Sequence, residues 1–337
     1  MKELLRREKE SQSDFEKRLI YGKLVDNTLK DYDFTEIYKA LYDVDISTTE
    51  ARKRCYGILN SINSKIEKIY DKSIMFINDI HVPYQRDDLL QVIAKHKEEI
   101  THLCIIGDFL DCYSISSFSK IRQTTLKEEV LTGYEVLKQI RKILNNNQKI
   151  IMLKGNHEDR WRKVIENLKD EDMQSFINPN ILEMYSEGFT IYEKGKRKKY
   201  PPIENLTVIN HWYAIIDGIV ACHPLTFSNT KGSVVEKCSQ HFLSKGVDFD
   251  LAIFAHTHKY TSAVTERFSN KFVIENCCMC KAQKYADTGK LNYSRQTYGY
   301  TIVKYNTGDR VTLNNCKSYI LDPEPEELDF QKYNLEL

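Results

Sequence analysis

The sequence predicts an α/β fold with largely buried strands, on two observations. The first is that short apolar runs alternate with helical patterns from residue 73 onward, which is typical of strands covered on both faces. The runs are SIMFIND, HLCIIGD, KIIMLKGN, GIVACHP and LAIFAHTH, and the helical patterns cover Asp88–Glu98, Leu126–Leu144 and Val234–Leu243. The second is a pair of hairpin signals, around Asp217-Gly218 and at Asn306–Asp309, which add antiparallel strands to the parallel set.

In the first seventy residues the apolar residues recur with helical spacing, and we expect a helical extension there. Helical periodicity covers Asp14–Leu29, Thr35–Tyr42 and Thr49–Ile62, and Ser47 or Thr48 is suited to be the N-cap of the last helix. The last two helices, joined by a short turn, resemble a helix-turn-helix.

Three basic residues on the opening turns of the last helix are candidates for contact with DNA. They are Arg52, Lys53 and Arg54, at the place from which recognition helices reach base edges. Because the segment is nearly charge-balanced, an amphipathic helical cap with solvated charges is an alternative. Assembly of two chains through these helices is another.

Composition excludes several classes of protein. The chain has 337 residues, 41% hydrophobic and 29% charged, with a formal net charge of +1, so there is no overall electrostatic case for nucleic acid or membrane. No stretch is apolar enough to span a bilayer, and the charged start does not resemble a signal peptide, so we expect a cytoplasmic protein. Its nine cysteines are then expected to be reduced thiols.

The sequence also supports predictions for three further segments. The CCMC run, Cys277–Cys280, is expected to pack as part of a strand, with a structural zinc site as the less favoured alternative. Lys194–Pro202 is expected to be an exposed basic loop. Residues 321–337 are expected to be an acidic tail on the surface.

Metal-capable side chains follow each of the five apolar runs. They are Asp79 and His81, then Asp108 and Asp111, then Asn156, His157, Glu158 and Asp159, then His223, and last His256 and His258. Because ligand crevices form at the carboxyl ends of strands in an open α/β sheet, we expect these side chains to converge. Mixed imidazole and oxygen ligands suit manganese, iron or zinc, and a carboxylate can bridge two ions. The Asp-x-His and His-x-His spacings are expected to direct both side chains to one face of an extended strand.

The motifs DIH, GDFLD, GNHE, the lone His223 and AHTH, in this order, resemble those of the calcineurin-like metallophosphoesterase superfamily, over Ser73 to Leu313. The resemblance implies a four-layer αββα sandwich of two mixed sheets for residues 71–320, after a helical extension at 1–70. It also implies two divalent cations, with Mn²⁺ expected and Fe or Zn possible. One ion would be held by Asp79, His81, Asp108 and His258, and the other by Asp108, Asn156, His223 and His256, with Asp108 bridging.

The same resemblance implies a mechanism. A hydroxide between the two ions would attack phosphorus, while His157 would face the scissile ester as general acid. Asp111 would orient a ligand or His157. Arg160 or Arg162 could clamp a substrate phosphate, with plain surface charge as the alternative.

The helical extension and the basic loop favour DNA as the phosphate-ester substrate, and therefore a nuclease. The architecture also looks like the phosphoesterases carried by bacteriophages and prophages. One alternative is a phosphoprotein or nucleotide phosphatase or a cyclic-nucleotide phosphodiesterase, although GDFLD is not followed by the arginine-glycine of protein Ser/Thr phosphatases. A further alternative is a non-catalytic DNA-binding protein with a vestigial metal site.

Overall fold

The computed structural model describes residues 2–65, 70–117, 124–193, 195–228, 230–265, 271–282 and 296–323. The chain divides into two compact units, Met1–Ile69 and Tyr70–Leu337, each of which is described by itself.

The first unit is helical. After a short 3-10 helix at Lys2–Leu4 it contains α1 (Gln12–Leu24), α2 (Phe34–Tyr42) and α3 (Thr48–Lys65). A capping box begins α2, in which the Asp33 carboxylate and the Glu36 side chain accept each other's backbone N–H groups. The helices pack around a small core that includes Phe15, Leu19, Ile20, Ile37 and Cys55. The predicted helices are confirmed, but the first ends at Leu24 and not at Leu29, because the Leu29 N–H turns back to the carbonyl of Gly22.

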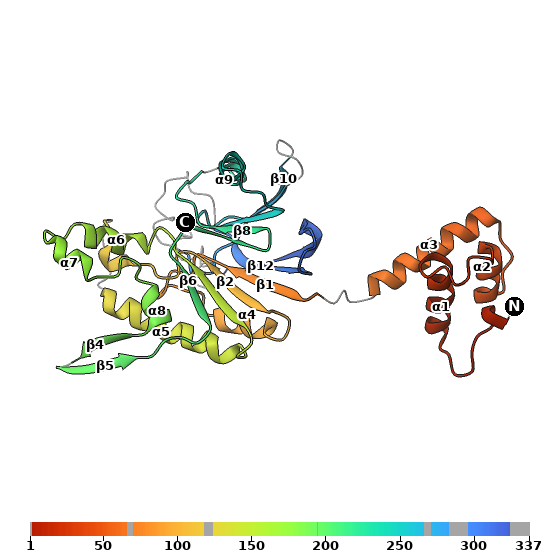
Figure 1. Ribbon diagram of the computed structural model, residues 1–337, viewed down its shortest axis with the longest axis horizontal. Coiled ribbons are helices and arrows are strands. Elements are labelled where there is room, and N and C mark those ends of the chain that lie inside the picture. The colour runs from red at the N-terminus through yellow and green to blue at the C-terminus, as the bar shows by residue number, and fades with distance from the viewer. Residues whose placement is uncertain are drawn as a thin grey trace, which may run out of the picture. The chain divides into compact units, whose positions relative to one another are not determined.

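The second unit is built on two sheets (Figure 1). The first has the order β13-β12-β1-β2-β3-β6, with parallel pairing from β1 to β6 and antiparallel pairing of β12 and β13. Its strands are β1 (Lys72–Ile77), β2 (His102–Ile106), β3 (Lys149–Leu153), β6 (Leu206–Ile209), β12 (Tyr298–Tyr305) and β13 (Cys316–Leu321). The second has the order β10-β11-β9-β8-β7. Its strands are β7 (Tyr213–Ile216), β8 (Ile219–Cys222), β9 (Leu251–Phe254), β10 (Thr261–Thr265) and β11 (Lys271–Glu275).

Alternation along the strands produces four layers. In β1, Met75 and Ile77 join the apolar core beneath α4 (Leu89–His96) and α5 (Leu126–Ile143), whereas Ile74 and Phe76 join the core between the two sheets. On the far side of the second sheet, β8 and β9 pack against α9 (Ser233–Ser244). The order helices, sheet, sheet, helix is the predicted four-layer sandwich of mixed sheets, which is confirmed.

Smaller elements decorate the first helical layer. They are a 3-10 turn at Tyr113–Ile115, the helices α6 (Asp159–Glu166), α7 (Glu171–Ser175) and α8 (Glu183–Glu187), and the hairpin of β4 (Phe189–Glu193) with β5 (Lys196–Tyr200). Another 3-10 turn, Leu313–Asn315, lies between β12 and β13, and its Leu313 packs against the core between the sheets.

The structure confirms one of the two predicted hairpins and corrects the other. The hairpin at Asp217-Gly218 is confirmed, with both residues in the left-handed region. The second hairpin is longer than expected: its return strand is β13, because Arg310 and the Val311 N–H bind the Asp250 carboxylate instead of pairing with β12.

Two other segments also differ from expectation. The predicted basic loop is wrong, since Lys196–Tyr200 is strand β5, while Lys194 lies outside the described residues. The CCMC run is not a continuous strand, because β11 ends at Glu275 and only isolated bridges follow at Cys278 and Cys280. Of the predicted acidic tail, residues 324–337 lie outside the described residues. In the part of the chain that the structure describes, no helix has the length and apolar character needed to cross a membrane.

Candidate active site

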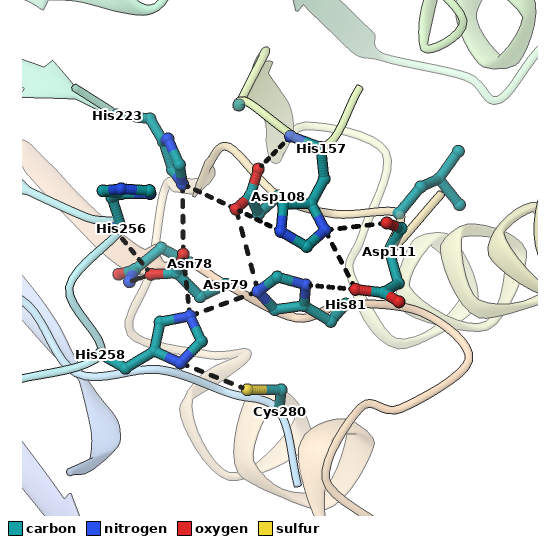
Figure 2. A network of polar contacts seen from close by, with 12 residues as sticks. Asn78, Asp79, His81, Asp108, Asp111, His157, His223, His256, His258 and Cys280 are labelled. Atoms are coloured by element: carbon teal, nitrogen blue, oxygen red, sulfur yellow. Dashed lines mark hydrogen bonds and ion pairs between the residues drawn. The ribbon is translucent and has the colours of Figure 1, made fainter. Parts of the chain in front are cut away.

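The metal-capable side chains converge where strands of both sheets end (Figure 2). The loop after β1 supplies Asp79 and His81, that after β2 supplies Asp108 and Asp111, that after β3 supplies Asn156 and His157, the end of β8 supplies His223, and the loop after β9 supplies His256 and His258.

Short distances join these side chains into one cluster. The His223 Nε2 atom lies 3.1 Å from Asp79 Oδ1 and 3.2 Å from Asp108 Oδ2. The His258 Nε2 atom lies 3.4 Å from Asp79 Oδ1 and 3.3 Å from His81 Nε2, which is itself 3.8 Å from Asp108 Oδ2. Donor atoms of Asp79, His81 and Asp108 form one group that could hold an ion, and those of Asp108, His223 and His256 form another. Asp108 belongs to both groups.

The backbone that presents these residues is left-handed, not extended. The φ angles are 49° at Asp79, 52° at His81, 47° at Asp108, 83° at His256 and 56° at His258. The members of the Asp-x-His and His-x-His pairs do converge, but the expected extended strand is wrong, since each residue follows its strand in a turn. Left-handed residues other than glycine are uncommon and gather at functional sites, so five of them around one cluster indicate a specialised centre.

Two glycines permit the close approach of these loops. A Cβ atom on Gly155 would lie 2.1 Å from Asp108 Oδ1 and 2.3 Å from the Asp108 backbone nitrogen. A Cβ atom on Gly107, where φ is +68°, would lie 2.5 Å from the His223 ring. The loops after β2, β3 and β8 can therefore meet only if these side chains are absent.

The surrounding charges keep the buried carboxylates of Asp79 and Asp108 ionised. Burial raises the pKa of Asp79 and Asp108, but the neighbouring charges of His258 and His223 outweigh it and hold both pKa values well below the usual range. Burial, aided by the charge of His223, lowers the pKa of His256 to about 4.

The donor set fits divalent cations. The Asn156 Oδ1 atom is buried without a hydrogen-bond partner, which is rare for a buried polar atom and is explained if it faces a ligand. Its neighbours in the chain, Gly155 and His157, both lie against the buried carboxylate of Asp108. Buried charge of this kind is tolerated when it is paired or coordinates a metal. Mixed oxygen and nitrogen donors suit manganese, iron or zinc.

His157 stands at one side of this cluster in a network with Asp111 and Arg160. Its Nδ1 lies 2.8 Å from the Asp111 carbonyl oxygen and 3.0 Å from the Asp111 carboxylate, which also lies 2.9 Å from His81 Nδ1. Its Nε2 lies 3.1 Å from an Arg160 nitrogen, and Arg160 donates to the Asp111 carbonyl at 2.8 Å. Burial lowers the pKa of His157, but the charge of Asp108 and the hydrogen bond to Asp111 raise it, and the net pKa is raised.

The other basic residues that the sequence singled out as candidates for contact with phosphate or DNA lie on α6 and on α3. Arg162 forms ion pairs with Asp159 and Glu166 on the surface of α6. In the helical unit, Arg52, Lys53 and Arg54 are exposed on α3. The Arg52 guanidinium lies over the rings of Phe34 and Tyr56, and Arg54 binds Glu50 at 2.7 Å and the Tyr38 hydroxyl at 3.1 Å.

Two residues at the site were not assigned roles from the sequence. Glu158 is buried and accepts the N–H groups of Leu110 at 2.8 Å and Gly155 at 2.9 Å, so it fastens two loops together. Burial and the charge of Asp108 raise its pKa to about 7. The sequence shows Glu158 within the GNHE motif, but it does not indicate which loops the side chain joins. The Cys280 Sγ atom lies 4.0 Å from His258 Nδ1, and Cys280 forms a possible ion-holding group with His81 and His258. The sequence favours a packing role for Cys280 within the CCMC run.

Comparisons with known proteins agree with this geometry. The family model described as calcineurin-like phosphoesterase matches residues 72–260, which is more than half of the chain. No curated protein matches the sequence.

Several solved structures are similar at low identity. An archaeal phosphodiesterase is 15% identical, with 74% of this chain and 99% of that chain covered and a TM-score of 0.34. Vps29 of Entamoeba histolytica, complexed with Zn²⁺, is 12% identical, with coverage of 74% and 98% and a TM-score of 0.34. A predicted phosphoesterase of Streptococcus pneumoniae is 10% identical, with coverage of 74% and 98% and a TM-score of 0.28. On the family match, the chain belongs to the calcineurin-like phosphoesterases and is a metal-dependent hydrolase of phosphate esters.

Proposed function

We propose that this protein is a two-metal nuclease that hydrolyses phosphodiester bonds in DNA, with His157 as general acid. The observation that carries the proposal is the position of His157 beside Asp108, where Asp111 holds one ring nitrogen and the other faces Arg160. A protonated imidazole fixed next to a cation site is what the departure of an alkoxide requires.

The other residues of the cluster would hold the two cations. Asp79, His81, Asp108 and His258 would hold one cation, and Asp108, Asn156, His223 and His256 the other, and we infer Mn²⁺ from the mixture of oxygen and imidazole donors. When bound, the two cations would supply a nucleophilic water of lowered pKa and positive charge for the phosphoryl oxygens.

Asp111 and Arg160 prepare His157 for its role. The Asp111 carboxylate fixes the Nδ1 side of His157, and Nε2 lies 3.8 Å from Asp108 Oδ2. An Arg160 nitrogen lies 3.1 Å from Nε2 and donates to it. A substrate phosphate would draw the guanidinium to its own oxygens, since arginine binds phosphate in a bidentate manner. Nε2, which no longer accepts from Arg160, would then carry the proton that passes to the leaving oxygen.

The general-acid role is tested with esters of different leaving groups. In His157→Ala, hydrolysis of an oligonucleotide, whose leaving alkoxide is poor, should fall by about 10²–10⁴-fold, while bis(p-nitrophenyl) phosphate, whose leaving group needs no proton, should be affected far less. Metal content should stay that of the wild type. Arg162→Ala is the matched control, because Arg162 pairs with acids of its own helix. Wild-type oligonucleotide cleavage by His157→Ala would refute the role.

DNA as substrate is supported by the exposed basic residues on α3. With Mn²⁺, the protein should cleave members of a panel of linear duplex, single-stranded and circular DNA. Changing Arg52, Lys53 and Arg54 together to Ala should impair this cleavage and leave aryl diester turnover unchanged. Equal loss of both activities would mean that the helices support the fold and not the substrate. Hydrolysis of aryl monoesters alone would indicate a phosphatase.

Two further inferences concern the setting of the enzyme. The nine cysteines, all of them among the described residues, form no disulfide with one another, and from this we infer a reducing, cytoplasmic location. The helical unit could also join two chains, and light scattering of the full chain and of the triple variant tests this: a dimer that the triple variant abolishes would assign the exposed face of α3 to assembly.

A further inference from the structure

The hairpin of β4 and β5 stands apart from both large sheets. The two strands pair only with each other among the described strands, and the hairpin projects from the end of the helical layer that contains α5 and α8 (Figure 1). We call residues 189–200, without residue 194, the arm.

Aromatic rings fix the base of the arm. The rings of Phe189 and Tyr200 stack at 4.8 Å with an angle of 8° between their planes, and Tyr134 of α5 meets both edge-on at 5.5 Å and 5.2 Å. Tyr185 of α8 contacts Phe189 at 6.2 Å and Phe109 at 6.0 Å, and Phe109 directly follows Asp108. A continuous set of ring contacts therefore holds the arm in a set position relative to the active site.

The two faces of the arm differ in chemistry. Residues opposite each other in an antiparallel pair point to the same face, so Phe189 and Tyr200 share the inner face with Ile191 and Lys198. The inner face carries one carboxylate, Glu193, which lies 3.4 Å from Lys127 of α5 and 3.9 Å from Lys198. Lys196, opposite Glu193, is also on this face.

The outer face carries Thr190 opposite Lys199, and Tyr192 opposite Arg197. Tyr192 is 71% exposed, and both cations are exposed. No carboxylate of the described residues pairs with Arg197 or Lys199. The outer face is thus an exposed ring flanked by two unneutralised cations.

We propose that this outer face binds single-stranded DNA, with Tyr192 stacking on a base and Arg197 and Lys199 binding backbone phosphates. The inference deepens the proposed function and rests on it, since it names the form of nucleic acid that the site receives. A ring beside cations is the combination that single-strand binding uses. In a duplex the base faces are already stacked and are closed to the ring.

A competing explanation is that the cations only prevent aggregation at the open edges of the hairpin. Lysines on edge strands serve this purpose. That explanation accounts for the charges but not for Tyr192, because an exposed aromatic ring on an edge strand favours aggregation.

Fluorescence anisotropy of the full chain with Mn²⁺ tests the proposal. The probe is fluorescein-labelled oligothymidylate with a phosphorothioate backbone, which resists cleavage. Tyr192→Ala should weaken binding about tenfold, as expected for one lost stacking contact, and Tyr192→Phe should retain wild-type affinity. Arg197→Ala with Lys199→Ala should reduce the slope of log K against log salt by about 1.4, the value for two phosphate contacts on a single strand.

The matched control removes two exposed lysines from helices, Lys142 of α5 and Lys237 of α9, and should leave both the affinity and the slope close to the wild type. Equal effects of the arm and control variants, an unchanged affinity in Tyr192→Ala, tighter binding of a duplex of the same length, or no binding by the wild type would each overturn the proposal.

Cleavage of unmodified DNA, measured in parallel, separates the two ideas. Binding without cleavage, with the arm variants impaired, would refute DNA hydrolysis and retain the arm as a binding surface. Cleavage by the wild type with the arm variants unimpaired would refute the arm alone.

Discussion

Gly155→Ala is expected to inactivate the enzyme without unfolding it. Gly155 lies in the loop after β3, against Asp108 of the loop after β2. Its φ angle is not in the left-handed region, so alanine meets no backbone strain there. Any effect of the substitution must therefore come from the space that its methyl group occupies.

The magnitude follows from two distances. The added Cβ would lie 2.1 Å from Asp108 Oδ1 and 2.3 Å from the Asp108 nitrogen, whereas real Cβ contacts are essentially never under 3.0 Å. One loop must therefore move by about 0.9 Å, and the near contact with a backbone atom excludes escape by side-chain rotation alone. A misplacement of about 1 Å at a reacting centre can cost about 10²-fold in rate, so kcat/KM should fall by about two orders of magnitude.

The assay is hydrolysis of bis(p-nitrophenyl) phosphate with saturating Mn²⁺, together with calorimetric titration of Mn²⁺, which should bind more weakly to the variant. Gly57→Ala is the matched control, since a Cβ at Gly57 in α3 meets nothing within 4 Å. The control should keep wild-type turnover and gain about 0.5–1 kcal/mol of stability, as alanine does in a helix. Turnover by Gly155→Ala within threefold of the wild type would show that the contact of the two loops is not needed.

Three further predictions concern stability. Glu129 is buried, and burial raises its pKa from 4.5 to about 7. The stability that its protonated form contributes is therefore complete below pH 4.5 and is lost as the pH rises through 7. Relative to Glu129→Gln, the free energy of unfolding of the wild type in denaturant should fall by about 3 kcal/mol between pH 4.5 and 8. Glu158→Ala should cost about 2–6 kcal/mol because the Leu110 and Gly155 N–H groups lose their acceptor, and Glu158→Gln about half as much, since it keeps one oxygen; equal stability of the three proteins would contradict this. Chelation of a metal bound at about 100 times its Kd removes about 2.7 kcal/mol, so calorimetry should show the melting temperature fall by about 5–10 °C, and an unchanged melting temperature would argue against a cation at the site.

The positions of the main strands along the sequence were predictable because they depend on short-range patterns. The apolar runs that end in Asp79, Asp108 and His223 are buried on both faces and were identified as strands by that property alone. Wrong expectations arose where long-range contacts decide the local structure. Lys196–Tyr200 has the composition of a loop but becomes a strand because Tyr200 stacks on Phe189 and meets Tyr134 edge-on.

The membership of the site was also largely predictable, whereas its geometry was not. Residue type and order indicated which side chains to bring together. The left-handed turns at Asp79 and His256 could not be anticipated, since neither residue is a glycine and the surrounding structure imposes the conformation. The roles of Glu158 and Cys280 could not be predicted either, because their partners Leu110 and His258 lie in loops that follow other strands.

Asp108 couples four of the five converging segments, and this determines how substitutions there must be interpreted. Its carbonyl accepts the His81 N–H at 2.9 Å, its Oδ1 accepts the His157 N–H at 2.9 Å, and its Oδ2 lies 3.2 Å from His223 Nε2. Two of these contacts belong to the carboxylate and one to the backbone. Asp108→Ala would therefore remove one contact of the loop after β3 and one of the His223 ring at the same time, although His223 keeps its contact with Asp79 at 3.1 Å, and lost activity in that variant would not identify a metal ligand. Asp108→Asn retains an Oδ1 acceptor for His157 and removes the charge, so a comparison of metal binding in the two variants separates coordination from the positioning of the loops.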